Sequence, residues 1–505
     1  MKLNAIKKAM ILLTGIVIVT SCSEEFLTDI DSNGLATEDA YYSSQSEAYA
    51  GLTSVYDVLS WDTFVGRLAG LNSASDDFYA GGGNSTDVNE IQVWQTYTLN
   101  PTTGPAAEYW KKGFSGVFRA NVLLRKLPGV PMDPALIARY SAETKFLRAF
   151  YYFDLVRFFK NIPLIIEPIA TADYYNVPQA APEAVYAQIE TDLSEAISAL
   201  PASVPAATEG GRATQAAAKA LLAKVYLFEG KYAESAQLFA EVNGNPGSVS
   251  PYGNSLLPNF ADLWETNNKF NAESIFEIVH SGSGNYGDWN NLAGSEGFLL
   301  NQMVGPRAYV AISGSAPDYI SGYSFNTVTE DLYNAYSNAD ARKNATIANL
   351  KQMKIDGIAD YTPGYNDTGY FLEKFAGRVH NRHSGAGATE LNWQQDTYEI
   401  RLADTYLMEA EAIVHSGGSQ ARAQALLDAV RLRAGLASIP ATDDNIFNER
   451  RLELAGEGQR WFDLVRTNRA AAKLGSRGFV SGKNEILPIP IGELSNTVLQ
   501  QNPNY

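Results

Sequence analysis

The sequence holds a single cysteine among its 505 residues. Without a second cysteine the chain forms no internal disulfide, so packing of the core must stabilise the fold. After the first 21 residues no apolar run approaches the roughly 20 residues that span a bilayer. Basic residues are also scarce. The chain has 39 Lys and Arg but 56 Asp and Glu, which gives a net charge of −17. A body this acidic is repelled by nucleic acid, so we expect no nucleic-acid partner.

The only cysteine, Cys22, follows an N-terminal segment with the layout of a secretory signal. Lys2 gives the segment a basic start. An apolar run, MILLTGIVIV, then extends over Met10–Val19, and Ser21 directly precedes the cysteine. Such a run is too short for a stable membrane span and is typical of a cleaved signal peptide, here 1–21. A cysteine at the cleavage point predicts a lipoprotein whose acylated Cys22 is held in membrane lipid. An ordinary signal peptide beside an incidental cysteine is the alternative.

A short polar segment follows the cysteine. Residues 22–37 begin with Ser23, Glu24 and Glu25 directly after Cys22, and they are interpreted as a tether between the lipid and the folded body. Acidic residues in this place also resemble a surface-export signal of some Gram-negative lipoproteins. No hard linker divides the remaining residues, so 38–505 is predicted to form a single domain.

Helical periodicity dominates both ends of that domain. Apolar residues recur at three- and four-residue steps in Arg139–Lys160, where Ser141 is placed to cap the helix. Ala216–Val242 predicts two helices joined at Gly230, in a spacing that approximates the tetratricopeptide repeat. Arg401–Leu436 repeats this arrangement, and a weaker copy lies around 109–126. The fold class is therefore predicted to be mainly α, with degenerate tetratricopeptide-like helix pairs forming a right-handed scaffold from 38–242 and 401–505.

The intervening residues, 243–400, have a different composition. They hold 17 of the 41 glycines and many Asn, Ser and Tyr residues, which disfavours long helices there. Long irregular segments on a rigid scaffold commonly carry binding groups. The sequence therefore predicts a loop-rich ligand-binding region at 243–400.

Near the C-terminus a run of alternating charges stands at helical spacing. Acids and bases of this run predict ion pairs between turns and with neighbouring helices. The residues are Glu449, Arg450, Arg451, Glu453 and Glu457. Pro488 and Pro490 then predict an extended tail that lies over the helices. These features are interpreted as structural.

Several segments together resemble the SusD/RagB family of outer-membrane nutrient-binding lipoproteins. Each match is short, but their order extends over nearly the whole chain. The segments are FLRAFYYF from Phe146 with NIPL from Asn161, AESIFEI from Ala272, RLADTYLMEAEA from Arg401, VRLRAGL from Val430, ERRLELAGEGQRWFDLVR from Glu449, LPIP from Leu487 and the terminal QNPNY.

The resemblance implies a lipid-anchored protein on the outer membrane that faces the cell exterior. It implies capture of an oligosaccharide or polysaccharide without catalysis, and delivery to a SusC-like TonB-dependent transporter beneath it. Capture of peptides by the same architecture is an alternative within the family. The resemblance implies no cofactor, and leaves open whether a structural Ca²⁺ is bound.

Loop aromatics are the candidate ligand contacts, because sugar rings stack on aromatic faces while amide and carboxylate groups bind the hydroxyls. Trp289 is the first candidate, since it lies among polar neighbours in a glycine-rich loop. Trp94, in the earlier loop 72–104, is the second and Trp393 the third. The candidate set is Trp289, Tyr286, Asn290, Asn291, Trp94, Asn72, Asp76, Tyr79 and Trp393. Trp110, Trp264 and Trp461 are instead expected in the core.

The hypotheses of a glycoside hydrolase and of a metal site have weaker support in the sequence. The adjacent Asp76 and Asp77 could serve a surface glycoside hydrolase, but hydrolysis requires two carboxyl groups about 5–9 Å apart in one cleft. His380 and His383 have a suitable spacing for a metal on a helix, yet neighbouring glycines favour a loop and no third ligand is apparent. We therefore expect no catalytic residues and no metal site.

Overall fold

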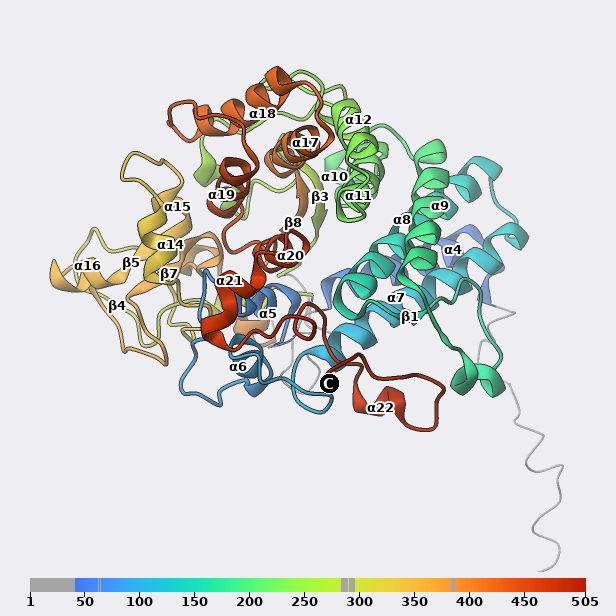
Figure 1. Cartoon of the computed structure of the whole chain (residues 1–505), viewed down its shortest axis with the longest axis horizontal. Helices are drawn as coiled ribbons and strands as arrows, with labels where there is room; N and C mark the ends of the chain where they lie inside the picture. The colour runs from blue at the N-terminus through green and yellow to red at the C-terminus, as the bar shows by residue number, and fades with distance from the viewer. Residues whose placement is uncertain (1–40, 62, 64, 283–288, 290–295, 383–386) are drawn as a thin grey trace, which may run out of the picture.

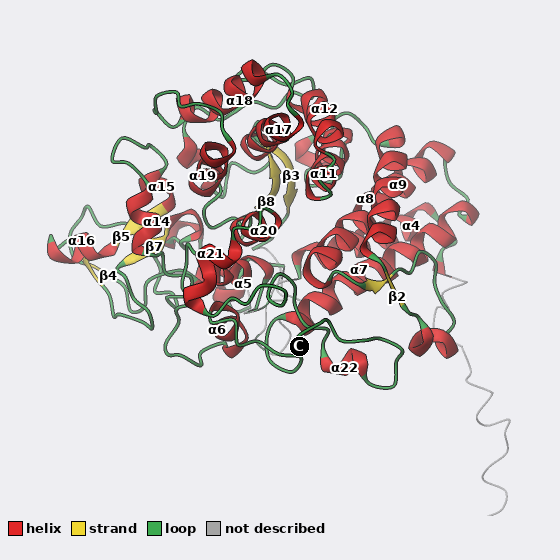
Figure 2. Cartoon of the chain, in the orientation of Figure 1, coloured by secondary structure: helices red, strands yellow, loops and turns green. Residues whose placement is uncertain are grey.

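The computed structural model describes residues 41–505 except 62, 64, 283–288, 290–295 and 383–386. Within these ranges helices predominate, and the strands are short and pair two by two (Figure 2). None of the helices in the described part of the chain combines the length and apolar character that a membrane span requires. The predicted mainly α class is confirmed.

Successive helices of the scaffold pack side by side in an arc (Figure 1). Contacts join α4 to α7, α7 to α8, α8 to α9, α9 to α11, α11 to α12, α12 to α17, and α17 to α18. Their bounds are α4 (Gln45–Ser60), α7 (Ala106–Lys126), α8 (Pro134–Phe159), α9 (Pro182–Ala199), α11 (Gln215–Phe228), α12 (Tyr232–Asn243), α17 (Leu402–Ser416) and α18 (Gln420–Arg433). The predicted helix pairs at 216–242 and 401–436 are thus confirmed, with α12 bringing the two pairs together.

The ends of these helices follow from local chemistry. Gly230 and Gly417 adopt φ of 75° and 70°, a conformation that glycine reaches without strain, and each lies in the turn between paired helices. Helix α8 begins earlier than predicted, because Asp133 accepts a hydrogen bond from the Ala135 amide and Pro134 occupies the first turn. Ser141 therefore lies inside the helix and is not its cap.

Shorter helices complete the chain around this arc. They are α5 (Arg67–Ala74), α6 (Asn89–Gln95), α10 (Ala206–Glu209), α13 (Leu300–Met303), α14 (Glu330–Ala335), α15 (Lys343–Thr346), α16 (Leu350–Ile355), α19 (Asp443–Glu453), α20 (Arg460–Arg466), α21 (Ala470–Leu474) and α22 (Ile491–Leu494). The 3₁₀ turns are η1 (Leu127–Gly129), η2 (Thr171–Asn176), η3 (Phe260–Trp264), η5 (Glu373–Phe375), η6 (Val379–Asn381), η7 (Thr389–Leu391) and η8 (Gly475–Arg477).

The strands form four antiparallel pairs in the described ranges. The pairs are β1 (Ile162–Pro163) with β2 (Gln179–Ala180), β3 (Ser274–Ile278) with β8 (Thr397–Arg401), β4 (Val310–Ala311) with β6 (Ala359–Asp360), and β5 (Ile347–Asn349) with β7 (Tyr370–Leu372). Strand β8 ends the loop-rich region directly before α17, and β3 pairs with it from within the same region.

The main apolar core lies between the scaffold helices. Trp461 is fully buried, with its ring 5.5 Å from that of Trp94 and 6.3 Å from that of Phe158. Trp110 is also buried and packs 5.1 Å from Phe159, whereas Trp264 is half-buried against a smaller core. The expectation that these tryptophans serve packing is met.

A buried ion-pair network connects the loop-rich region to the scaffold. Arg401 donates to Glu273, Glu453 and Glu457, and Lys374 donates to Glu457 at 2.7 Å. Burial alone would raise the pKa of Glu453, but the guanidiniums of Arg433, Arg401 and Arg342 outweigh it and hold the pKa well below 4.5. The ion pairs predicted for the charged run are confirmed, and their partners come from distant segments.

The C-terminal tail lies over α8, as its prolines predict. The amide of Leu487 donates to the Phe158 carbonyl at 2.7 Å, and the Asn502 side chain donates to the Phe159 carbonyl at 3.0 Å. Backbone groups at the end of α8 are thereby satisfied by the tail.

Candidate functional site

Trp289 stands on a loop whose two ends are joined at their base. The Ser281 amide donates to the Glu296 carbonyl at 2.8 Å, directly after strand β3 and its extension. Trp289 is 42% exposed, which is unusual for so large an apolar side chain. Trp289 therefore presents an aromatic surface toward solvent.

A groove of about 310 Å³ runs beside the base of this loop, and we call it the α4 groove. One wall comes from α4, which contributes the exposed ring of Tyr49 and the carboxylate of Asp57. Arg212 lies on the segment before α11, and the exposed Val279 follows β3. The groove thus combines an aromatic ring, an apolar side chain and charged hydrogen-bonding groups. The lining residues are Tyr49, Leu52, Thr53, Tyr56, Asp57, Leu59, Ser60, Gly210, Gly211, Arg212, Glu277, Ile278, Val279, Ser281 and Glu296.

Trp61 lies next to the groove at the C-terminal end of α4. Its indole N–H donates to Asp57 at 3.0 Å, and the Arg119 guanidinium lies 4.9 Å from the ring centroid. Arg119 also donates to Asp57 at 2.7 Å. These contacts fix the orientation of a half-buried aromatic ring beside the groove.

Two carboxyl groups of the groove, Glu277 and Glu296, have raised pKa values. Burial, and then the charge of Asp57, raises the pKa of Glu296 above its usual value. Burial and the neighbouring Asp396 raise the pKa of Glu277 to about 7. His280 between these segments is buried, which lowers its pKa to about 3 and keeps its imidazole neutral. The groove therefore carries less negative charge than its carboxyl groups suggest.

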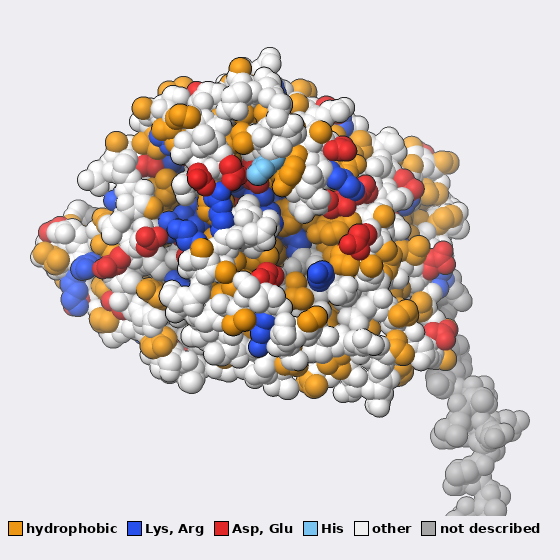
Figure 3. Space-filling model, in the orientation of Figure 1, with side chains coloured by type: hydrophobic (Ala, Val, Ile, Leu, Met, Phe, Trp, Pro, Cys, Tyr) orange, Lys and Arg blue, Asp and Glu red, His pale blue; other side chains and the backbone are white. Residues whose placement is uncertain are grey.

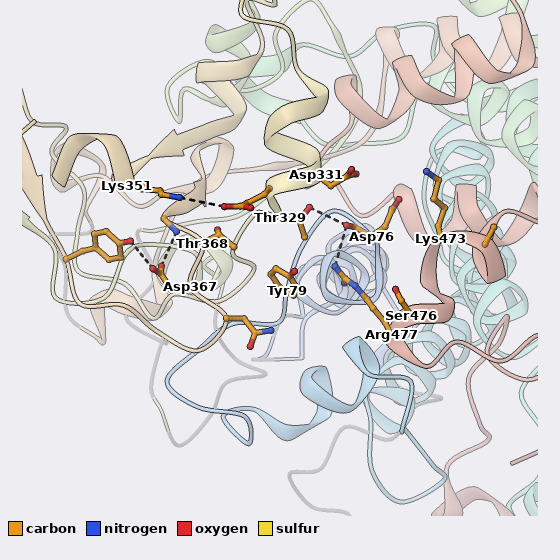
Figure 4. A pocket seen from close by; sticks show the side chains of 15 residues that line it. Asp76, Tyr79, Thr329, Asp331, Lys351, Asp367, Thr368, Lys473, Ser476 and Arg477 are labelled. Atoms are coloured by element: carbon orange, nitrogen blue, oxygen red, sulfur yellow. Dashed lines mark hydrogen bonds and ion pairs between the residues drawn. The ribbon is translucent and has the colours of Figure 1, made fainter. Parts of the chain in front are cut away.

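A second depression, of about 910 Å³, lies on another part of the molecule, and we call it the Tyr79 cleft. Four parts of the chain form its walls, as Figure 4 shows: the segment 76–79, the start of α14, the segment 351–369, and α21 with η8. Helix α21 lies at the front of Figure 1, on a face whose hollowed middle gathers acidic and basic side chains (Figure 3). The lining residues are Asp76, Tyr79, Thr329, Glu330, Asp331, Lys351, Tyr361, Asn366, Asp367, Thr368, Gly369, Ala472, Lys473, Ser476 and Arg477.

Two of the predicted site residues, Asp76 and Tyr79, meet in this cleft. Asp76 accepts two hydrogen bonds from Arg460, at 2.7 and 2.8 Å. Burial opposes ionisation of Asp76, but Arg460 outweighs it and lowers its pKa. Arg477 lies 5.0 Å from the centroid of the Tyr79 ring and donates to the Phe78 carbonyl. Both predicted residues are therefore held in place at a surface depression.

Three of the predicted contact residues are buried in the structure, which leaves them little surface for a ligand. Trp94 is fully buried between Tyr109 and Trp461, so its ring faces are covered by other aromatics. Trp393 is 2% exposed. Asn72 is buried and donates to the Gly456 carbonyl at 3.0 Å. Each of these residues contacts a segment far away in the sequence, as Trp393 does when its carbonyl accepts from the Phe298 amide, and single-sequence patterns do not reveal such contacts.

Other predicted residues lie outside the described residues. They are Tyr286, Asn290, Asn291 and Cys22, together with the signal segment 1–21 and the tether 22–37. Trp289, which is described, remains the first candidate for ligand contact.

Several groove residues escaped the sequence analysis. Tyr49 and Asp57 lie on a regular helix and carry no local mark of function, while Arg212 and Val279 come from separate segments. Sequence spacing cannot show that these segments converge.

The histidines do not form a metal site in the described part of the chain. His380 contacts Asp318 at 2.7 Å, and His383 lies outside the described residues. The described residues contain no group of three or more His, Cys, Asp or Glu side chains placed to hold a metal ion.

Comparison with known proteins gives matches at both ends of the chain and across its whole length. Residues 358–505 match the model described as the SusD family, and residues 31–227 match a model described as starch-binding associating with outer membrane. A SusD-like protein P2 from Formosa agariphila is 24% identical over 95% of this chain and 96% of its own length.

Two solved structures share both the fold and substantial sequence. A laminarin-binding SusD-like protein is 52% identical, covers 92% of this chain and 100% of its own, and superposes with a TM-score of 0.89. Surface glycan-binding protein A from Bacteroides thetaiotaomicron, solved with laminarihexaose, is 29% identical over 91% of this chain and 100% of its own, with a TM-score of 0.81.

Proposed function

Because the chain belongs to the SusD family, we propose that it binds a laminarin-type glucan at the cell surface without cleaving it. The observation that carries this proposal is the 52% identity to a laminarin-binding SusD-like protein across 92% of the chain. A similarity this high over the full domain preserves the scaffold and many of the surface loops. Binding of laminarihexaose by a second, more distant relative supports the same class of ligand.

The Trp289 loop and the α4 groove have the chemistry that such a ligand requires. A glucan presents apolar ring faces bordered by hydroxyl groups and carries no charge. The exposed ring of Trp289 and the oriented ring of Trp61 supply stacking surfaces. Arg212 and Asp57 supply a hydrogen-bond donor and acceptor in the neighbouring groove. We assign ligand binding to this surface.

We also infer that the protein does not hydrolyse the glucan. The carboxylate pair that suggested hydrolysis is engaged with arginines, since Asp76 binds Arg460 and Asp77 accepts from Arg451 at 2.6 Å. Asp77 is fully buried and does not reach the surface. A general acid must lie within hydrogen-bond distance of the glycosidic oxygen, which a buried carboxyl group such as that of Asp77 does not reach.

The remaining parts of the proposal concern location and partners. Acylation of Cys22 would hold the protein on the outer membrane, facing the exterior, and a SusC-like TonB-dependent transporter would receive the glucan. The family description that associates one matching model with the outer membrane supports this location. Peptide capture and glycan hydrolysis are outcomes that the following experiment detects.

Titration of the purified body (residues 23–505) with laminarihexaose tests the proposal. Binding is expected, with no shorter products released, and Trp289→Ala is expected to weaken affinity about 10-fold through loss of ring stacking, roughly 1.4 kcal/mol. Tyr174→Ala is the matched control, because Tyr174 is also 48% exposed but lies away from the groove. Release of shortened chains, or binding of peptides alone, would contradict the proposal.

A further inference from the structure

Unpaired polar groups line the Tyr79 cleft on two of its sides. Within the described part of the chain, the Tyr79 hydroxyl, the Asn366 side-chain amide and the Lys473 ammonium have no hydrogen-bond or ion-pair partner. Tyr79 and Asn366 are half-buried, so their polar groups lie in a recess and not on an open surface. The Ser476 hydroxyl adds another donor and acceptor at the same place. A ligand with several hydroxyl groups would satisfy this set.

Three of the four carboxylates that line the cleft are paired with cations. Asp331 pairs with Arg451, and Glu330 lies 3.7 Å from Lys351. Asp367 accepts a hydrogen bond of 2.9 Å from the Tyr361 hydroxyl (Figure 4). With Asp76 bound by Arg460, the Asp367 carboxylate is left without a cationic partner among the described residues, and the Lys473 ammonium supplies the opposite charge in the same cleft. This balance favours an uncharged ligand over an anion or a cation.

The size and polarity of the cleft narrow the ligand class further. Its volume of about 910 Å³ lies within the range of about 300–1000 Å³ typical of small-molecule sites. Such sites are usually lined by apolar side chains, whereas this one is lined mainly by charged and hydroxyl-bearing residues. A hydroxyl-rich molecule of several sugar rings matches both properties.

We propose that the Tyr79 cleft is a second carbohydrate site, which takes an uncharged oligosaccharide segment. The cleft shares no lining residue with the α4 groove, so the two sites are separate. This inference rests on the proposed function, because it assigns the same ligand class to a new place. On a surface coated with polymer the two sites engage glucan together, which raises the apparent affinity by avidity.

The test compares immobilised laminarin with soluble laminarihexaose. The cleft variant combines Tyr79→Phe, which keeps the ring beside Arg477, with Asn366→Gly, which keeps the backbone at φ 52°. We expect its affinity for immobilised laminarin to fall about 10-fold through loss of two sites of hydrogen bonding. Affinity for laminarihexaose, which we assign to the α4 groove, is expected to stay within twofold of wild type.

A matched control variant combines Tyr174→Phe with Asn496→Gly. Tyr174 is exposed, and Asn496 is exposed at φ 59°, so the same chemical changes occur away from both sites. Its binding to both probes is expected to equal wild type, and equal thermal midpoints for all three proteins establish folding. If wild type binds both probes and the cleft variant retains its laminarin affinity, the second site is refuted alone. If wild type binds neither probe, the proposed function fails and this site with it.

Discussion

The scaffold helices pack through apolar faces, whereas the segment 243–400 joins the scaffold through buried ion pairs. In α18, Leu426, Leu427 and Val430 are fully buried and lie on one side of the helix. In the other region, the fully buried Arg342 pairs with Asp340, Glu449 and Glu453, the last two from α19. The glycine-rich segment also has small apolar clusters of its own, around residues such as Phe325 and Leu350, and the buried ion pairs join it to the scaffold.

Removal of Arg401 is expected to have the largest effect, because it takes one cation away from three buried glutamates, Glu273, Glu453 and Glu457. Arg401→Met should lower the free energy of unfolding by about 3–5 kcal/mol at neutral pH. Glu453 has a pKa held well below 4.5 in the native state, so this difference should shrink as the pH falls below 4.5. Urea denaturation at several pH values measures it, and a loss that is constant with pH would contradict this account.

Truncation of an apolar side chain in the scaffold is expected to lower the free energy of unfolding slightly less, and by the same amount at every pH. Leu426→Ala creates a cavity in α18 and should lower the free energy of unfolding by about 2–5 kcal/mol. No ionisable group changes its surroundings, so the loss should be equal at neutral and acidic pH. The same denaturation series checks this expectation, and a strong pH dependence would show that the two regions are not stabilised differently.

Protonation of a single scaffold carboxylate, Asp463, is expected to have an intermediate effect on the free energy of unfolding. Burial opposes ionisation of Asp463, but Arg450 and Arg466 outweigh it and lower its pKa to about 2. Because the native pKa lies below the unfolded value of 3.8, this group stabilises the fold above pH 3.8 and loses that contribution as the pH falls toward 2. The loss should be about 2 kcal/mol. Asp463→Asn should flatten the stability profile between these pH values, and an unchanged profile would exclude Asp463 as its source.

Helix caps in the two regions are expected to give the smallest effects. Thr442 caps α19 by accepting from the Asn445 amide, and Asn349 caps α16 by accepting from the Gln352 amide. Thr442→Ala and Asn349→Ala should each cost about 1 kcal/mol. If the ion pairs make both regions one cooperative unit, both losses should appear in the same unfolding transition. Separate transitions monitored by fluorescence and circular dichroism would show that the regions unfold independently.

The sequence predicted the helical parts of the fold well for a physical reason. The apolar residues of 216–242 and 401–436 repeat at helical spacing, and glycines mark the turns at Gly230 and Gly417. These are local signals, since each helix buries a stripe that its own sequence defines. The first turn of α8 was missed because Asp133 and Pro134 form an equally good start further upstream.

The candidate site was predicted only in part, because exposure depends on the rest of the chain. Trp289 and Trp94 both lie in polar, loop-like segments, yet one is 42% exposed and the other is fully buried. Their difference arises from Tyr109 and Trp461, which cover Trp94 and come from distant helices. The groove residues Tyr49 and Arg212 had no local signal at all.

Local patterns were enough to predict the mainly α class, the helix pairs and, through the order of the motifs, the resemblance to the SusD family. These properties depend on periodicity and on residues adjacent in the chain. Tertiary contacts were needed to learn which aromatics reach solvent, that the α4 groove and the Tyr79 cleft exist, and which carboxylates are paired with cations. Those properties depend on contacts such as Asp76 with Arg460, which join residues 384 positions apart. The energies of such contacts are set by burial, and burial is a property of the folded chain alone.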